Sequence, residues 1–376
     1  MSFNKGIPFT EIIKGLPSTA PFVGPESLER RLGKNFNLRL GANESNFGMS
    51  SKAFEAIQKG IHEASWYGDP ENYELRCCLA EIHDINPEEI CVAGGIDDLL
   101  GLVVRMTVSK GTPVVTSLGG YPTFNYHVIG FSGILSFVPY LDDCENTEGL
   151  LDIALESNSP LIFFANPDNP MGTWHDATHV QKFIESIPLG KLLILDEAYF
   201  EFSPKDSIPP IDTKNERVIR MRTFSKAHGM AGLRIGYAIA NKKIINNLNK
   251  VRLHFAVSRI AQIGALASLK DDKHVKNVLS KVNQGKEEYY MLGKELNLKY
   301  IESGTNFVSF DLGTKDRAKQ ILNALEREGV FVRMSSVPVL SRCIRVTVGN
   351  RSQRKLFSEI FKSVLEKQKK IELVRN

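Results

Sequence analysis

Residues 218–240 read VIRMRTFSKAHGMAGLRIGYAIA, and this stretch decides the fold class. Its two ends, Val218 to Met221 and Ile235 to Ala240, are short apolar runs of the kind found in buried strands. Between them lies a loop of small residues with hydroxyl side chains, Lys226 and a second cation, Arg234. Such a loop at the end of a buried strand is where an amine can be held near a phosphate.

Similar apolar runs precede this stretch, and amphipathic segments such as 97–109 and 176–186 separate several of them. This alternation is typical of a mainly parallel sheet covered by helices on both faces. We therefore predict an α/β fold with strands at Ile90 to Ala93, Pro113 to Thr116, Leu161 to Ala165, Leu192 to Leu195, Val218 to Met221 and Ile235 to Ala240.

The pattern changes beyond residue 257. A long polar helical segment, 275–296, is followed by a helix at 315–328, a closing helix, and short apolar runs at 306–311, 330–333 and 344–348. This predicts a smaller α+β domain. We divide the chain into an N-terminal arm (1–40), a large domain (41–257) and a small C-terminal domain (258–376).

Composition narrows the class of protein. The 376 residues are 42% hydrophobic and 24% charged, and the net charge of +4 comes from nearly balanced totals of 47 basic and 43 acidic residues. The sequence shows no dense basic face, which disfavours a nucleic-acid partner. No window approaches 18 uninterrupted apolar residues, so we expect no membrane span.

The cysteines and the N-terminus indicate a cytoplasmic protein. The five cysteines form no CxxC pair, and an odd number in a chain of this size favours reduced thiols. The first residues, MSFNKGIPFT, lack the apolar stretch of a signal peptide.

Polar residues follow several of the predicted strands, where ligands of open α/β sheets bind. The first strand runs into a turn at Gly94 and Gly95, and the free amides of the helix that follows suit a phosphate, although a plain strand-to-helix turn explains them equally well. The loop 166–172 reads NPDNPMG, and residues 196–199 read DEAY.

Two other kinds of site are disfavoured. A strand that ends in Asp-Glu also occurs in P-loop ATPases, but none of the Gly-Lys pairs is followed by Ser or Thr, so the phosphate-binding partner motif is missing. His175 and His179 have the spacing of metal ligands, yet a partly exposed helix start explains them better. We predict no metal site.

These elements, in this order, resemble the fold type I pyridoxal-phosphate (PLP) aminotransferases, and within them the histidinol-phosphate aminotransferase group. The resemblance rests on SKAHGMAGLRIG at 225–236, DEAY at 196–199 and NPDNPMG at 166–172, and it runs from about Leu40 to the final helix. ANESNFG at 42–48 and RVTVG at 345–349 support the narrower group.

The resemblance implies a role for each candidate residue. Lys226 would bind the cofactor as a Schiff base and move a proton, and Asp196 would pair with the pyridine nitrogen. Tyr199 and Asn169 would contact the phenolic oxygen, and Tyr121 would stack on the ring, with Phe124 as the fallback. The phosphate would be held by Gly95, Ile96, Asp97, Thr223, Ser225 and Arg234, with Tyr67 from a second subunit of a homodimer. The substrate would be held by Asn43, Arg345 and Arg259.

The resemblance implies transfer of an amino group from a small-molecule donor, histidinol phosphate, to a 2-oxo acid, 2-oxoglutarate, in amino-acid biosynthesis. A PLP-dependent decarboxylase or lyase and an aromatic amino-acid aminotransferase remain alternatives. A transcription regulator with this fold would need a DNA-binding module, for which residues 1–40 leave too little room. Two departures from the family pattern bear on specificity, namely Met171 and the segment from Leu253 to Arg259, which includes His254.

Overall fold

A computed structural model describes residues 7–16 and 23–375, with side chains up to residue 370, so part of the expected N-terminal arm lies outside the described residues. Its centre is a seven-stranded sheet in which β8 is antiparallel to both neighbours and all other pairs are parallel. The predicted α/β class with a mainly parallel sheet is confirmed. The order of strands is β2 (Ile90–Ala93), β8 (Gly236–Ala240), β7 (Val218–Thr223), β6 (Leu192–Asp196), β5 (Leu161–Ala165), β3 (Pro113–Ser117) and β4 (Ile134–Val138).

Helices cover both faces of this sheet because successive strand residues point to opposite sides. Phe163 and Ile194 pack with α5 (Ile96–Thr107), α6 (Pro122–Gly130) and α9 (Lys242–Val251). Phe164 and Leu195 face the other way and pack with α7 (Thr147–Glu156) and α8 (Ala177–Ser186). Strands buried on both sides need continuous apolar sequence, which is why β5 reads LIFFA.

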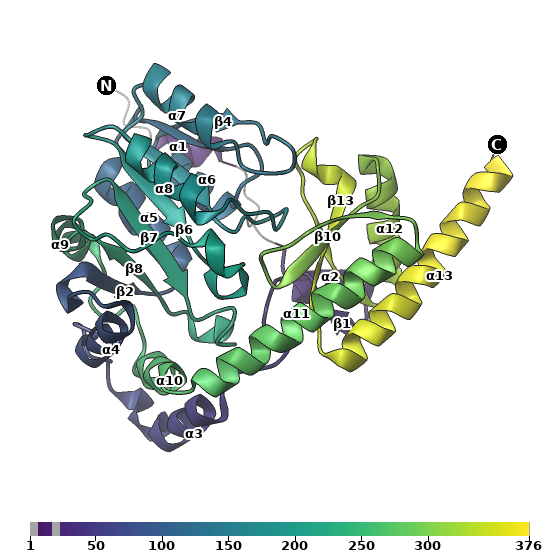
Figure 1. Ribbon diagram of the computed structural model, residues 1–376, viewed down its shortest axis with the longest axis horizontal. Coiled ribbons are helices and arrows are strands. Elements are labelled where there is room, and N and C mark those ends of the chain that lie inside the picture. The colour runs from purple at the N-terminus through teal and green to yellow at the C-terminus, as the bar shows by residue number, and fades with distance from the viewer. Residues whose placement is uncertain (1–6, 17–22, 376) are drawn as a thin grey trace.

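A smaller α+β unit lies beside the large sheet, as the sequence predicts (Figure 1). Its four strands are ordered β12 (Arg333–Met334), β13 (Cys343–Thr347), β10 (Phe307–Asp311) and β9 (Lys299–Ile301), all antiparallel. Its helices are α11 (Asp272–Glu295), α12 (Lys315–Arg327) and α13 (Arg351–Arg375). A separate parallel pair joins β1 (Leu38–Arg39) to β11 (Val330–Phe331), so chain from the expected arm contributes to this unit.

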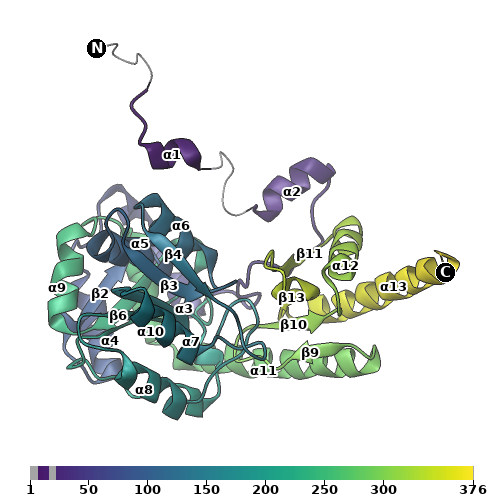
Figure 2. The ribbon, with the colours of Figure 1, turned by 90° about the horizontal axis from the view of Figure 1, so that it is seen from above.

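Helix α10 (Arg259–Leu269) differs from the expectation that the small unit begins at residue 258. It packs on α3 (Ser51–Gly60) and α4 (Tyr73–His83), and its Ala261 and Ala265 share a buried cluster with Ile90 of β2. The next helix, α11, runs from the large sheet to the side of α13 (Figures 1 and 2). The exact domain limits stay a prediction.

The remaining elements are short. They are the helices α1 (Glu11–Gly15) and α2 (Pro25–Leu32) and the 3-10 turns η1 (Ile61–Ser65), η2 (Pro87–Glu89), η3 (Phe200–Phe202), η4 (Lys205–Ser207), η5 (Ala231–Leu233) and η6 (Leu340–Arg342). Within residues 7–16 and 23–375, none of the helices has the length and apolar character needed to cross a bilayer.

Candidate active site

Lys226 lies in the loop directly after β7, half-buried at the carboxyl end of the sheet. Burial, reinforced by the positive charge of Arg345, lowers the pKa of its amine to about 8. The Nζ atom lies 5.6 Å from the centre of the Tyr199 ring. An amine with this pKa is partly unprotonated at neutral pH, which is the form that attacks a carbonyl carbon.

Asp196 is the last residue of β6 and is buried at the same edge. Its Oδ1 accepts a hydrogen bond of 2.9 Å from the amide of Ala198, and no salt bridge of the described residues involves it. Burial and the nearby carboxylate of Asp97 raise its pKa to about 7. A buried carboxyl without a cation partner suits a ligand that brings a protonated nitrogen.

A cradle for an anion lies where the β2–α5 turn meets the loop after β7. No described side chain caps α5, so the amides of Ile96 and Asp97 remain available at its N-terminus. Arg234 reaches this turn, donating from Nη2 to the Oδ2 of Asp97 at 3.2 Å and from Nη1 to the Ser225 hydroxyl at 3.4 Å. Thr223 donates to the same hydroxyl oxygen at 2.9 Å.

Gly95 makes this approach possible. Its φ of 95° is a conformation that other residues rarely adopt, and a Cβ atom there would lie 2.7 Å from the Nη2 of Arg234. The turn therefore keeps its backbone close to the guanidinium. Helix amides, hydroxyls and a guanidinium converging on one point fit a phosphate group.

Aromatic side chains line the same region. The Tyr121 hydroxyl donates to the Oδ1 of Asp97 at 2.9 Å, and the buried Tyr199 hydroxyl accepts from the Nδ2 of Asn43 at 2.8 Å. Phe124 is fully buried and stacks on Phe163 at 4.8 Å, inside the core. The fallback assignment to Phe124 is therefore wrong, because its ring has no face left for a ligand.

Arg345, in the middle of β13, is the residue that the small unit contributes to this site. Its Nη1 donates to the Oδ1 of Asn169 and its Nη2 to the carbonyl of Gly41 at 3.1 Å, while its Nε is buried without a partner among the described residues. Its guanidinium also lies 5.2 Å from the centre of the Phe307 ring. An orphaned guanidinium N–H in a buried position fits an anionic substrate group.

Asn43 links these parts, since its Oδ1 accepts from the Thr347 hydroxyl at 3.3 Å while its Nδ2 donates to Tyr199. Tyr67 and Arg259 lie together, apart from the other candidate residues. Arg259 donates to the carbonyl of Tyr67 from Nε at 3.1 Å and from Nη2 at 2.8 Å. Among described contacts, this pair touches none of the other candidate residues.

Sequence reasoning missed a buried pair of carboxyls behind Asn169. Asp168 and Glu145 are both buried here; burial raises the pKa of Asp168 to about 6, and burial together with the charge of Asp168 raises that of Glu145 well above its usual range. Asp168 also accepts from the Tyr140 hydroxyl at 2.8 Å and from the amide of Met171 at 2.9 Å. The raised pKa values disfavour ionisation of both carboxyls at once, because two neighbouring buried negative charges repel each other.

The acidic residue inside NPDNPMG was the only signal of this pair in the sequence. Met171, the departure noted in the same motif, is buried against Leu340 and Cys343 and so fills space between the loop and the small unit. His175 and His179 stack on each other at 4.3 Å, and their Nε2 atoms bond to the Glu145 carbonyl and the Thr147 hydroxyl.

Comparison with known proteins agrees with this geometry. The family model for aminotransferase class I and II matches residues 37–359. Histidinol-phosphate aminotransferase 1 of Bacillus cereus is 30% identical over 350 residues, 92% of this chain and 94% of the relative. The crystal structure of histidinol-phosphate aminotransferase from Sinorhizobium meliloti in complex with pyridoxal-5'-phosphate is 42% identical, with a TM-score of 0.92, and the match covers 96% of this chain and 99% of that one. Thermus thermophilus aspartate aminotransferase with maleate, 19% identical with a TM-score of 0.79 over 96% of this chain and all of its own, shares the fold.

Proposed function

The chain belongs to the class I and II aminotransferases, which makes it a PLP-dependent transaminase of fold type I, and from this premise we propose that it transfers the amino group of histidinol phosphate to 2-oxoglutarate. The observation that carries the proposal is the convergence of Lys226, Asp196, the Gly95–Arg234 cradle and Arg345 at one edge of the sheet. The similarity to histidinol-phosphate aminotransferases supports the choice of donor.

The residues of the site fit PLP group by group. The α5 amides, Ser225, Thr223 and Arg234 would hold its phosphate, Asp196 its ring nitrogen, Tyr199 and Asn169 its phenolic oxygen, and Tyr121 its ring face. Bound PLP supplies an electron sink that stabilises negative charge on the substrate Cα.

The chain's own residues supply proton transfer and orientation. Because the pKa of Lys226 is close to neutrality, its Nζ can both accept the proton of the substrate Cα and return it. Asp196 is buried and would be anionic beside a cation, so that it would hold the ring nitrogen in its protonated form. The hydrogen bond from Asn43 orients the Tyr199 hydroxyl, and the Tyr199 ring centre lies 5.6 Å from the Nζ of Lys226.

Arg345 would meet a different anionic group on each of the two substrates. The 2-oxo acid acceptor has a carboxylate that a guanidinium can grip, whereas histidinol phosphate has none and would present its phosphate to the same orphaned Nε. We propose that Arg345 serves both half-reactions through one anion site.

We further propose a cytoplasmic homodimer in which Tyr67 reaches the partner subunit's cofactor phosphate. Tyr67 is 74% exposed, which leaves its phenol available to a second chain. The free state of all five cysteines, each within the described residues, supports a reducing compartment.

A half-reaction screen tests the donor. Purified holoenzyme is mixed separately with histidinol phosphate, phenylalanine, tyrosine and arginine, and the loss of the cofactor's visible absorbance is followed. We expect histidinol phosphate to react with the highest second-order rate constant of the four donors. We also expect that none of the donors releases CO2. Faster reaction with phenylalanine or tyrosine would reassign the enzyme to aromatic donors, and CO2 release would make it a decarboxylase.

A further inference from the structure

The loop 66–72, which carries Tyr67, is held by side chains from residues 252–262. The carbonyl of Tyr67 accepts two hydrogen bonds from Arg259, at 3.1 and 2.8 Å. Gln262 then binds both backbone groups of Asp69, donating to its carbonyl at 3.0 Å and accepting from its amide at 3.1 Å. Two neighbouring points of the loop backbone are thus fixed to the start of α10.

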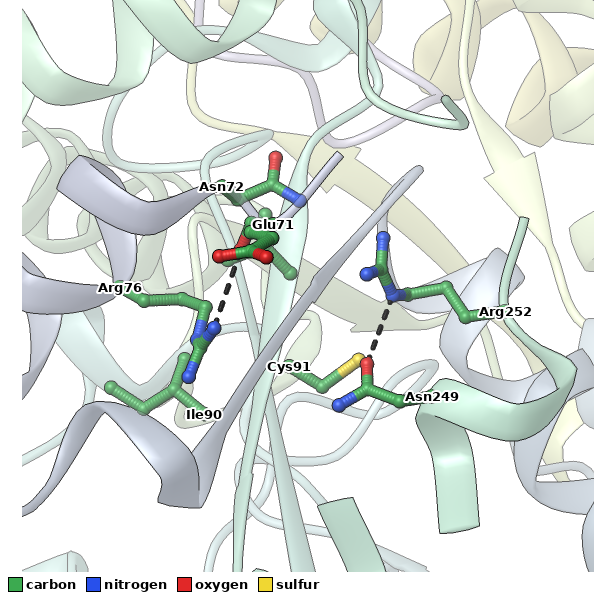
Figure 3. Close-up of a pocket in the computed structure, with 8 residues that line it drawn as sticks. Glu71, Asn72, Arg76, Ile90, Cys91, Asn249 and Arg252 are labelled. Carbon is green, nitrogen blue, oxygen red and sulfur yellow. Dashed lines mark hydrogen bonds between the residues drawn. The ribbon is translucent and has the colours of Figure 1, made fainter. Parts of the chain in front are cut away.

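The far end of the loop is fixed in the same way. Arg252 donates from Nη2 to the carbonyl of Pro70 at 2.9 Å and from Nε to Asn249 at 3.1 Å. Arg76 of α4 donates to the carbonyl of Glu71 at 3.5 Å. Figure 3 shows Arg76 and Arg252 on opposite sides of the pocket that Glu71 and Asn72 help to line, with the Arg76–Glu71 and Arg252–Asn249 hydrogen bonds drawn.

The Tyr67 ring itself has a fixed platform. It stacks on Phe255 with ring centres 4.3 Å apart and planes at 17°. The next residue, Gly68, has no room for a side chain, because a Cβ there would lie 2.4 Å from the Nε2 of Gln262 and 2.9 Å from the carbonyl of Val257. The phenol is therefore held in one direction although the side chain is largely exposed.

We propose that Arg259, Gln262 and Phe255, here called the Tyr67 clamp, are positioning residues that aim Tyr67 at the phosphate of the partner subunit's cofactor. The inference rests on the proposed dimer. Under this proposal, the segment from Leu253 to Arg259, which departs from the family pattern, affects how tightly the cofactor is bound. It does not determine which amino donor is accepted.

The bonding of Arg259 supports this assignment over a role as substrate ligand. A guanidinium grips a carboxylate with two parallel N–H groups. In Arg259, Nε and Nη2 are committed to the Tyr67 carbonyl, and Nη1 pairs with Glu63 at 3.2 Å. Gripping a second carboxylate would require breaking the contacts that hold Tyr67.

The test is a double-mutant cycle read by PLP binding, with activity as a second measurement. PLP is titrated into cofactor-free Arg259→Leu, Tyr67→Phe, the double variant and the wild type, and Kd is obtained from absorbance. We expect each single variant to raise Kd about tenfold, since each removes hydrogen bonds to or from a charged group. The double variant should match Tyr67→Phe alone, because Arg259 acts through Tyr67.

Matched variants separate positioning from general structure. Arg217 also donates to a backbone carbonyl, that of Ile187 at 2.8 Å, at the end of α8, so Arg217→Leu should leave Kd unchanged. Arg259→Lys keeps the positive charge and a single donor group but loses the fork of the guanidinium, and it should give an intermediate Kd. Phe255→Leu keeps every hydrogen bond of the loop and should raise Kd by loss of the ring contact, which guards against misfolding of Arg259→Leu.

The outcomes are distinguishable. If Tyr67→Phe weakens PLP binding and neither Arg259→Leu nor Phe255→Leu does, the clamp is overturned while the proposed dimer stands. If Tyr67→Phe binds PLP as tightly as the wild type, the proposed role of Tyr67 fails together with the clamp. If Arg259→Leu changes the ratio of kcat/KM between donors and leaves Kd unchanged, Arg259 is a substrate ligand.

Discussion

At the scale of single residues, Lys226 is the group on which the chemistry depends. It combines a pKa near neutrality with a place in the loop after β7, beside the ring of Tyr199. We expect Lys226→Ala to lower kcat by at least about a thousandfold, because both the covalent attachment and the proton transfer are lost.

The same variant should still bind PLP through the phosphate cradle, which its substitution does not touch. Dialysis should then remove the cofactor, whereas the wild type retains it. Substantial turnover by Lys226→Ala without added amines would show that another residue carries the cofactor.

The raised pKa of Asp196 predicts how the free energy of unfolding of the cofactor-free protein depends on pH. Its pKa of about 7 lies above the usual aspartate value, so the folded state binds this proton more tightly than the unfolded state. The associated stability is complete below about pH 4 and is lost as the pH rises through about 7. We expect Asp196→Asn to raise the free energy of unfolding by about 2 to 4 kcal/mol at pH 8. At pH 4 the substitution should change this free energy little.

Urea unfolding at the two pH values measures this difference. Asp152→Asn on α7 is a suitable control, since Asp152 is exposed. An equal effect of Asp196→Asn at pH 4 and pH 8 would mean that folding does not raise the pKa of this carboxyl. The Asp168–Glu145 pair contributes pH dependence of the same sign, so some slope should remain in the variant.

At the scale of elements, the β2–α5 turn determines how tightly the cofactor's phosphate is held. Gly95→Ala would place a methyl group against the Nη2 of Arg234 and force a positive φ on alanine. We expect the Kd for PLP to rise by about tenfold or more, with about 1 kcal/mol or more of lost stability.

Gly111→Ala is the matched control for this prediction. Gly111 also has a positive φ, of 83°, but nothing lies within 4 Å of a Cβ there, so the backbone strain is shared and the contact with Arg234 is not. PLP titration of both variants separates the two effects. Similar Kd values for the two would mean that strain alone explains the loss.

How well each element could be predicted depended on its burial. β5 was predicted at its observed bounds because all its residues are buried and a proline-containing loop ends it. β4 was missed because it is an edge strand whose Ile134 and Phe137 are 58% and 44% exposed, which blurs the pattern of a buried run. α10 was assigned to the small unit because its packing on α3 is a tertiary fact that periodicity does not contain.

The residues of the candidate site also differ in how well their positions could be predicted from the sequence. Lys226, Asp196 and Asn169 follow buried strands, so their place at the sheet edge could be predicted from the sequence pattern. Arg345 joins them only because the small unit folds back onto the large one, and its role came from family resemblance. The Asp168–Glu145 contact joins residues from different loops and leaves no local pattern.

At the scale of the whole molecule, the proposed dimer predicts that each site uses two chains. Lys226→Ala lacks its own attachment residue but still offers Tyr67 to its partner, and Tyr67→Ala has the opposite defect. When the two variants are mixed and allowed to exchange subunits, half of the dimers contain one complete site. We expect recovery of about a quarter of wild-type activity at limiting PLP.

Activity at limiting PLP, measured before and after exchange, checks this expectation. A mixture that never exceeds the sum of its parts would place Tyr67 outside the partner's site. Sedimentation of the wild type provides an independent check, because a fully active monomer is incompatible with shared sites.

The long helix α11 connects the side of the large sheet to the small unit. Its 24 residues span about 36 Å, from the neighbourhood of α10 to the side of α13 (Figure 2). Because α11 packs on β10, and β10 pairs Ser309 with Arg345 of β13, a rigid tilt of α11 would carry the Arg345 guanidinium with it. A tilt of roughly 5° at its first turn displaces the far end by about 3 Å, the length of one hydrogen bond. A slight change in the angle of α11 would therefore be enough to move Arg345 relative to Lys226 and Asp196, which belong to the large sheet.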